Sequence, residues 1–169
     1  MPNYVINLVN LIGDRNRIFE VMNNIKNDEL PLGSIDFNKI IPAPVDENGT
    51  VSCRWCMNHW GTNQNSIFND DFDDVDFIDV SENDIQLVFV TAWHGAHPIV
   101  AKLASENPDL SFVFTWAADT IFHEECGRYI YVNGVCVDRY YPVGKEAAWF
   151  SCEAWDLDAE DFLDNFWED

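Results

Sequence analysis

Two cysteines stand in a Cys-x-x-Cys spacing at Cys53 and Cys56, in a stretch that also carries His59. Such a pair is half of a structural zinc site, which needs four thiolate or imidazole ligands in a tetrahedral array. The sequence holds no second Cys-x-x-Cys and no His-x-x-x-His. A redox-active pair would call for a thioredoxin-like strand-to-helix context, which is not evident here. We therefore expect structural thiols, with no metal and no cofactor.

Histidines offer two further arrangements. His94 and His97 flank a glycine where a predicted strand meets a predicted helix, a place that suits anion binding or acid–base chemistry. A purely structural join is the favoured interpretation. His123 and Cys126 enclose two glutamates, but three residues in a turn rarely position a base on a thiol, and nearby carboxylates disfavour a thiolate. We predict no catalytic residues, and the sequence favours a non-enzymatic protein.

Carboxylates dominate the charged side chains, with a formal net charge of −21. Residues 1–68 carry seven acidic and five basic side chains, whereas residues 69–169 carry 23 acidic and four basic ones. The excess gathers in two clusters. The first acidic cluster comprises Asp70, Asp71, Asp73, Asp74, Asp76 and Asp79, and the second comprises Asp156, Asp158, Glu160, Asp161 and Asp164. Neither contains the central glycine of a calcium-binding loop.

This charge distribution restricts the class of partner. Direct nucleic-acid binding needs a basic patch, and the sequence has none. An acidic surface attracts basic partners, and its carboxylates can imitate the spacing of phosphates in the basic groove of a nucleic-acid-binding protein. We predict the two acidic clusters as the partner-binding residues. Solubility alone remains an alternative explanation of the charge.

The elements that must position these residues follow from hydrophobic periodicity. Ile18, Phe19, Met22 and Ile25 have helical spacing, with Asp14 as the N-cap, and Asn133-Gly134 is typical of a type I′ hairpin turn. Strands are predicted at 3–13, near 75–80, at 85–93 and at 110–119, with a hairpin at 127–142 and an acidic helix at 156–169. A helix with Pro98 in its first turn and Ile99, Val100 and Leu103 as its buried stripe is predicted between the last two of these strands. Residues 34–45 are expected to be extended, and 143–155 to be a connection with at most a short strand.

The order strand, helix, strand, strand, helix, strand predicts an α+β, ferredoxin-like fold, an antiparallel sheet with its helices on one face. Residues 127–169 would extend the same single domain, 1–169, by a hairpin and an acidic helix. Apolar residues make up 47% of the chain, enough for one packed core. No stretch reaches the ~20 apolar residues of a membrane span, and the N-terminus does not have the pattern of a signal peptide. A soluble, cytoplasmic protein is expected.

Four segments occur in an order that resembles YubB-type, ferredoxin-like proteins of plasmids, phages and conjugative elements: FNKIIPAP, WCMNHWGT, VFVTAWHGAHPIVAKLASENPDLSFVF and EECGRYIYVNG. The resemblance spans roughly residues 35–135. Asn63-Gln64 stands where that family usually has Lys-Trp. The resemblance implies the fold and a mobile-element origin, and it implies no reaction.

These observations together predict a non-enzymatic acidic binding protein of a mobile genetic element, with a basic, nucleic-acid-binding host protein as its partner. Nucleic-acid mimicry that blocks a host defence or DNA-binding protein is the sharpest form of this hypothesis. An alternative is a small-ligand or enzymatic pocket lined by Trp55, Trp60, Trp93 and His94. A second alternative is a soluble accessory protein without a charge-mediated partner.

Overall fold

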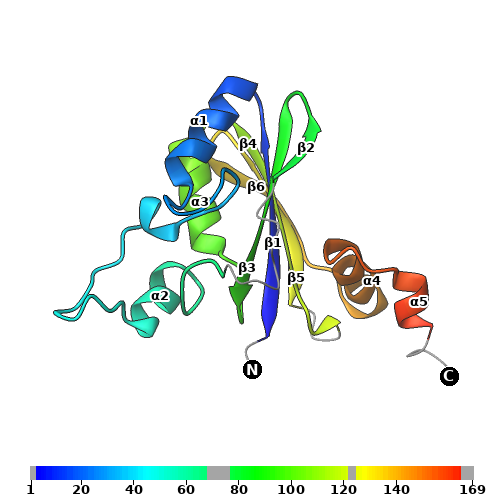
Figure 1. The fold of residues 1–169 in the computed structure, drawn as a ribbon. Coiled ribbons are helices and arrows are strands. Elements are labelled where there is room, and N and C mark those ends of the chain that lie inside the picture. Colours follow the sequence, from blue (N-terminus) through cyan, green and yellow to red (C-terminus); the bar gives the residue numbers. More distant parts are fainter. Residues whose placement is uncertain (1–2, 68–76, 122–124, 165–169) are drawn as a thin grey trace.

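The computed structural model describes residues 3–67, 77–121 and 125–164. Figure 1 shows a single twisted sheet with helices on both sides. The strands are β1 (Tyr4–Ile12), β2 (Ile78–Ser81), β3 (Asp84–Ala92), β4 (Ser111–Ala118), β5 (Cys126–Val132) and β6 (Val135–Tyr140). The helices are α1 (Arg15–Ile25), the 3₁₀ helix η1 (Phe37–Lys39), α2 (Cys53–His59), α3 (His97–Glu106), α4 (Gly144–Ala154) and α5 (Ala159–Leu163).

The sheet has the strand order β2-β3-β1-β4-β5-β6, and every neighbouring pair is antiparallel. Strands β1 to β4, which are connected through α1 and α3, have the split βαβ connectivity of a ferredoxin-like fold. This connectivity confirms the predicted fold class. The hairpin β5–β6 widens the sheet beyond β4. Asn133 and Gly134 both have positive φ, 52° and 79°, which confirms the predicted type I′ turn.

One face of the sheet carries the main core under α1 and α3. Alternate residues of the central strand β1 are buried, and the strands beside it present Phe89, Phe112 and Phe114 to the same side. Asp14 accepts a hydrogen bond from the Arg17 main-chain N–H at 3.0 Å and caps α1, as predicted. The buried stripes of α1 and α3 correspond to the predicted ones, apart from a half-buried Phe19.

The opposite face is partly covered by α4, which lies with α5 on the other side of the sheet from α1 and α3 (Figure 1). Residues 143–155 were expected to be a connection, and that expectation is wrong. The buried face of α4 consists of small residues, which give a weak hydrophobic signal in the sequence: Ala147, Ala148, Ser151, Cys152 and Ala154. The Trp155 indole N–H donates to the Ala117 carbonyl at 3.0 Å and fixes the end of α4 on β4.

Three other segments also differ in detail from the sequence expectation. Residues 34–45 contain η1, capped by Asp36, and are therefore not extended throughout. Residues 53–59, ambiguous by periodicity, form α2 with Ser52 as its N-cap. The acidic helix begins after Asp158, whose carboxylate accepts from the Glu160 and Asp161 N–H groups, and its predicted continuation over 165–169 lies outside the described residues. No helix in the described part of the chain is long and apolar enough to cross a membrane.

Candidate partner-binding site

The first acidic cluster lies mostly outside the described residues. Asp70, Asp71, Asp73, Asp74 and Asp76 fall in the segment 68–76. Asp79, on the edge strand β2, forms a two-pronged ion pair with Arg15, with a distance of 3.0 Å between Arg15 Nη1 and Asp79 Oδ1. Hydrogen bonding to the guanidinium lowers the pKa of Asp79. Its charge is therefore already compensated within the chain.

The second acidic cluster lies at and after the end of α4. Asp156 follows α4 in a left-handed backbone conformation with φ 54°. Asp158 serves as the cap of α5, and Glu160, Asp161 and Asp164 are exposed on or beside that helix. Asp156 is the member of this cluster that lines a pocket.

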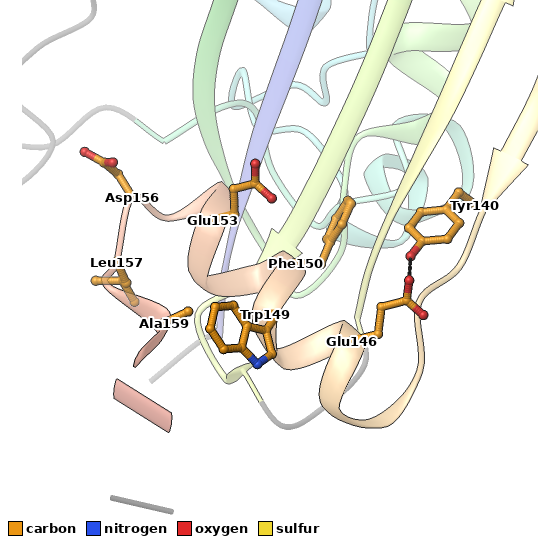
Figure 2. A pocket seen from close by; sticks show the side chains of 8 residues that line it. All are labelled: Tyr140, Glu146, Trp149, Phe150, Glu153, Asp156, Leu157 and Ala159. Carbon is orange, nitrogen blue, oxygen red and sulfur yellow. Dashed lines mark hydrogen bonds between the residues drawn. The ribbon is translucent and has the colours of Figure 1, made fainter. Parts of the chain in front are cut away.

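A pocket of about 500 Å³ lies between α4, α5 and the end of β6. Its walls combine aromatic rings and carboxylates (Figure 2). The lining residues are Tyr140, Glu146, Trp149, Phe150, Glu153, Asp156, Leu157 and Ala159. We refer to this site as the acidic-aromatic pocket. Its volume falls within the range of pockets that bind small molecules.

Two large apolar side chains in the acidic-aromatic pocket are open to solvent. Trp149 is 48% exposed and Leu157 is 42% exposed. The Tyr140 and Phe150 rings pack against each other at 5.8 Å between centroids, joining β6 to α4. Exposed aromatic surface beside a cavity is typical of a recognition site, because it offers contact area at low entropic cost.

The carboxylates of the acidic-aromatic pocket differ in their partners. Glu146 accepts a hydrogen bond from the Tyr140 hydroxyl, and this bond is the main reason that the pKa of Tyr140 is raised (Figure 2). Among the described residues, Glu153 and Asp156 have no cationic partner. The pocket therefore carries negative charge that the described part of the chain does not neutralise.

A smaller pocket of about 320 Å³ lies on the sheet side of α4 and shares Phe150 and Glu153 with the acidic-aromatic pocket. Its floor includes a row of cross-strand neighbours: Leu8 pairs with Thr115, and Thr115 with Arg128. Arg128 in turn pairs with Tyr140 of β6, and its guanidinium lies 5.4 Å from the centre of that ring. A cation is thus already stacked on one wall residue of the acidic-aromatic pocket.

The four residues of the predicted tryptophan pocket occupy two different environments. Trp60 is buried, donates its indole N–H to a main-chain carbonyl at 2.9 Å, and packs edge-on against Trp55 at 5.5 Å. Trp55 also stacks on His59 at 4.2 Å. Trp93 and His94 are exposed where β3 meets α3. Trp60 therefore acts as a packing anchor for the segment after α2.

The β3–α3 join is held by buried polar groups. Asn7 donates to the Thr91 hydroxyl at 2.9 Å and accepts from the Ala96 N–H at 3.0 Å, and Thr91 donates to the His94 carbonyl at 2.7 Å. Within this frame Trp93 adopts φ 73° and is 45% exposed. A bulky residue in the left-handed region is strained, and it persists only where its surroundings fix it.

The histidines that flank Gly95 also differ in environment. His97 packs against Trp116 at 4.3 Å and Phe114 at 5.2 Å, and its Nδ1 is buried without a hydrogen-bond partner in the described structure. Burial, followed by the proximity of His94, lowers the pKa of His97 to about 4. The two rings therefore do not form an exposed pair, and His94 lies 3.7 Å from Glu125.

The cysteines of the Cys-x-x-Cys spacing do not share an environment. Cys53 is exposed and Cys56 is buried, and burial raises the pKa of the Cys56 thiol. Cys126 is buried and donates toward the Ala147 carbonyl, whereas His123 lies outside the described residues. Within residues 3–67, 77–121 and 125–164, no group of three or more His, Cys, Asp or Glu side chains is placed to hold a metal ion.

Sequence reasoning missed the main wall of the acidic-aromatic pocket. Four residues of α4 recur at helical spacing along one stripe, in which two carboxylates flank two aromatic rings: Glu146, Trp149, Phe150 and Glu153. This i, i+3, i+4, i+7 pattern is the signal that could have revealed both the helix and the site. It was obscured because polar and aromatic residues, in place of aliphatic ones, carry the periodicity.

The chain matches a known protein-family model. The family model described as the ferredoxin-like domain in Api92-like protein matches residues 65–162, which is more than half of the chain. The matched region runs from the segment before β2 into α5 and so includes all of α4. No curated protein and no solved structure matches the chain.

Proposed function

This chain belongs to the family of the ferredoxin-like domain in Api92-like protein, and from that premise we propose that it is a non-enzymatic acidic binding protein for a basic partner. The family description names a fold and no reaction, so the proposal depends on the site. The observation that carries it is the acidic-aromatic pocket, whose Glu153 and Asp156 have no cationic partner among the described residues.

Electrostatics supports a basic partner. The chain has 30 acidic and nine basic side chains. Several of the bases are already paired in the structure, including Arg15, Arg17 and Lys39. The negative charge of Glu153 and Asp156 would steer a cationic partner toward this side of the molecule and repel nucleic acid.

The finer form of the proposal concerns origin and target. The YubB-type resemblance supports a protein of a mobile genetic element, and we propose a host nucleic-acid-binding protein as the partner. The carboxylates of the second acidic cluster and of the acidic-aromatic pocket would occupy its basic groove in place of phosphates. Duplex DNA should then compete with this chain for a basic probe, and binding of both at once would contradict the mimicry.

The test compares two variants that lose the same charge. The pocket variant carries Glu146→Gln, Glu153→Gln and Asp156→Asn. The control variant carries Glu29→Gln, Glu47→Gln and Glu82→Gln, three exposed positions away from α4. The probe is a labelled synthetic peptide of alternating arginine, lysine and glycine, measured by fluorescence anisotropy at low and high salt.

We expect the pocket variant to bind the peptide about tenfold to a hundredfold more weakly, since three partly exposed ion pairs contribute about 1–3 kcal/mol in total. The control variant should bind nearly as well as the native chain, and the affinity of the native chain should fall steeply with salt. Equal weakening in both variants would mean that only net charge matters. An affinity indifferent to salt would refute the proposal.

A further inference from the structure

We propose that the acidic-aromatic pocket accommodates a single arginine side chain of the partner. This inference rests on the proposed function and deepens it by naming the group that enters the site. An arginine side chain combines a planar cation with an apolar stem, and the pocket offers a surface for each part.

The lining of the pocket has an apolar part and a carboxylate part, which suit the stem and the charged head of an arginine side chain, respectively. Leu157, Ala159 and the rings of Trp149 and Phe150 offer apolar contact for a methylene stem. Glu153 and Asp156 supply carboxylate oxygens for the charged head. Figure 2 shows Trp149, Phe150 and Glu153 projecting from the same helix, with Asp156 on the segment that follows it. Cations bind favourably over aromatic faces, and most strongly over tryptophan.

The charge balance of the pocket points to a cation. Three carboxylates line it, and no lysine or arginine is among the lining residues. Glu146 is engaged by the Tyr140 hydroxyl, which leaves Glu153 and Asp156 as acceptors without a cation in the described structure. An anionic ligand would face repulsion from all three, and an uncharged ligand would leave two of them unpaired.

The chain itself shows how its aromatic rings receive cations. Three arginines lie over rings: Arg15 over Phe19 at 5.2 Å, Arg128 over Tyr140 at 5.4 Å and Arg139 over Tyr129 at 5.3 Å. A guanidinium stacks on a ring and is weakly hydrated, whereas an ammonium keeps its water more strongly. The exposed Trp149 ring therefore favours arginine over lysine.

Removal of Arg128 should change the affinity for an arginine probe in the opposite direction from removal of a pocket carboxylate. Its guanidinium lies over Tyr140, a wall residue of the pocket, but Arg128 belongs to the neighbouring sheet-side pocket. Its positive charge opposes the entry of a second cation. Replacement of Arg128 by glutamine should therefore strengthen binding of an arginine probe, whereas loss of a pocket carboxylate should weaken it.

The experiment uses two short glycine-flanked peptides that are identical except for one central arginine or lysine, titrated into the full chain by calorimetry at low salt. We expect the arginine peptide to bind about two- to fivefold more tightly than the lysine peptide. Trp149→Ala should remove this preference, and Trp149→Phe should retain part of it. Glu153→Gln should weaken both peptides, and Arg128→Gln should strengthen both. Circular dichroism of each variant checks that the fold is retained.

The outcomes separate the inference from the proposed function. Equal affinity for the two peptides, or a preference unaffected by Trp149→Ala, would overturn the arginine site. The proposed function would survive that result if the triple pocket variant still bound the multiply charged peptide more weakly than its control. Failure of the multiply charged peptide to bind the native chain at low salt would instead refute the proposed function.

Discussion

Acidification should destabilise the fold through His97, and the size of the effect follows from its surroundings. The ring is packed among Trp116, Phe114 and Tyr129, and its buried Nδ1 lacks a hydrogen-bond partner in the described structure. Burial first, and His94 second, lower the pKa of His97 from 6.5 to about 4. The folded chain therefore resists a proton that the unfolded chain accepts.

Above pH 6.5 His97 is neutral in both the folded and the unfolded chain, and its shifted pKa does not affect stability there. Because the pKa is lower in the folded chain, the unfolding free energy falls as the pH drops from about 6.5 toward 4. At pH 5 the shift corresponds to about 2 kcal/mol of lost unfolding free energy, reduced to about 1–2 kcal/mol because part of the ring meets solvent.

Urea denaturation at pH 8 and pH 5, together with NMR titration of the histidine ring protons, measures this effect directly. His97→Phe should reduce the loss of stability between the two pH values, whereas the exposed His59→Gln should leave it unchanged. A His97 ring that titrates near pH 6.5 in the folded protein would refute the reasoning, independently of how either variant folds.

Two further substitutions test the packing within the sheet and at the β3–α3 join. Gly127→Ala would place a Cβ 2.6 Å from the Trp116 ring and should lower the unfolding free energy by about 1–3 kcal/mol in denaturant titration; an unchanged midpoint would contradict this contact. Asn7→Ala leaves the buried Ala96 N–H without its acceptor at the β3–α3 join and should cost about 1–3 kcal/mol; retention of native stability would show that the join does not depend on Asn7.

The central strands β1, β3 and β4 and the helices α1 and α3 could be predicted because each buries one regular face. The alternation along β1 and the aliphatic stripes of α1 and α3 report that burial directly in the sequence. The Asn133-Gly134 turn was equally clear, since few residue pairs suit two positive φ values. These features are local, so a sequence pattern is enough to reveal them.

The site was harder to predict because it depends on contacts between distant segments. α4 buries alanines, a serine and a cysteine, whose pattern does not stand out from a connection. Tyr140 joins the pocket only because β6 ends beside α4, where its hydroxyl meets Glu146. The charge pattern indicated the acidic C-terminal region but could not distinguish Asp79, which Arg15 compensates, from Asp156, which lacks a cationic partner among the described residues.

The location of the binding surface is the central claim, and chemical-shift mapping tests it most directly. The isotopically labelled chain is titrated with the arginine–lysine–glycine peptide, and its amide signals are followed. We predict that the largest changes cover the end of β6, α4 and α5, including the Trp149 indole signal. Changes centred on Trp93 and His94 at the β3–α3 join, with none on α4, would contradict the account.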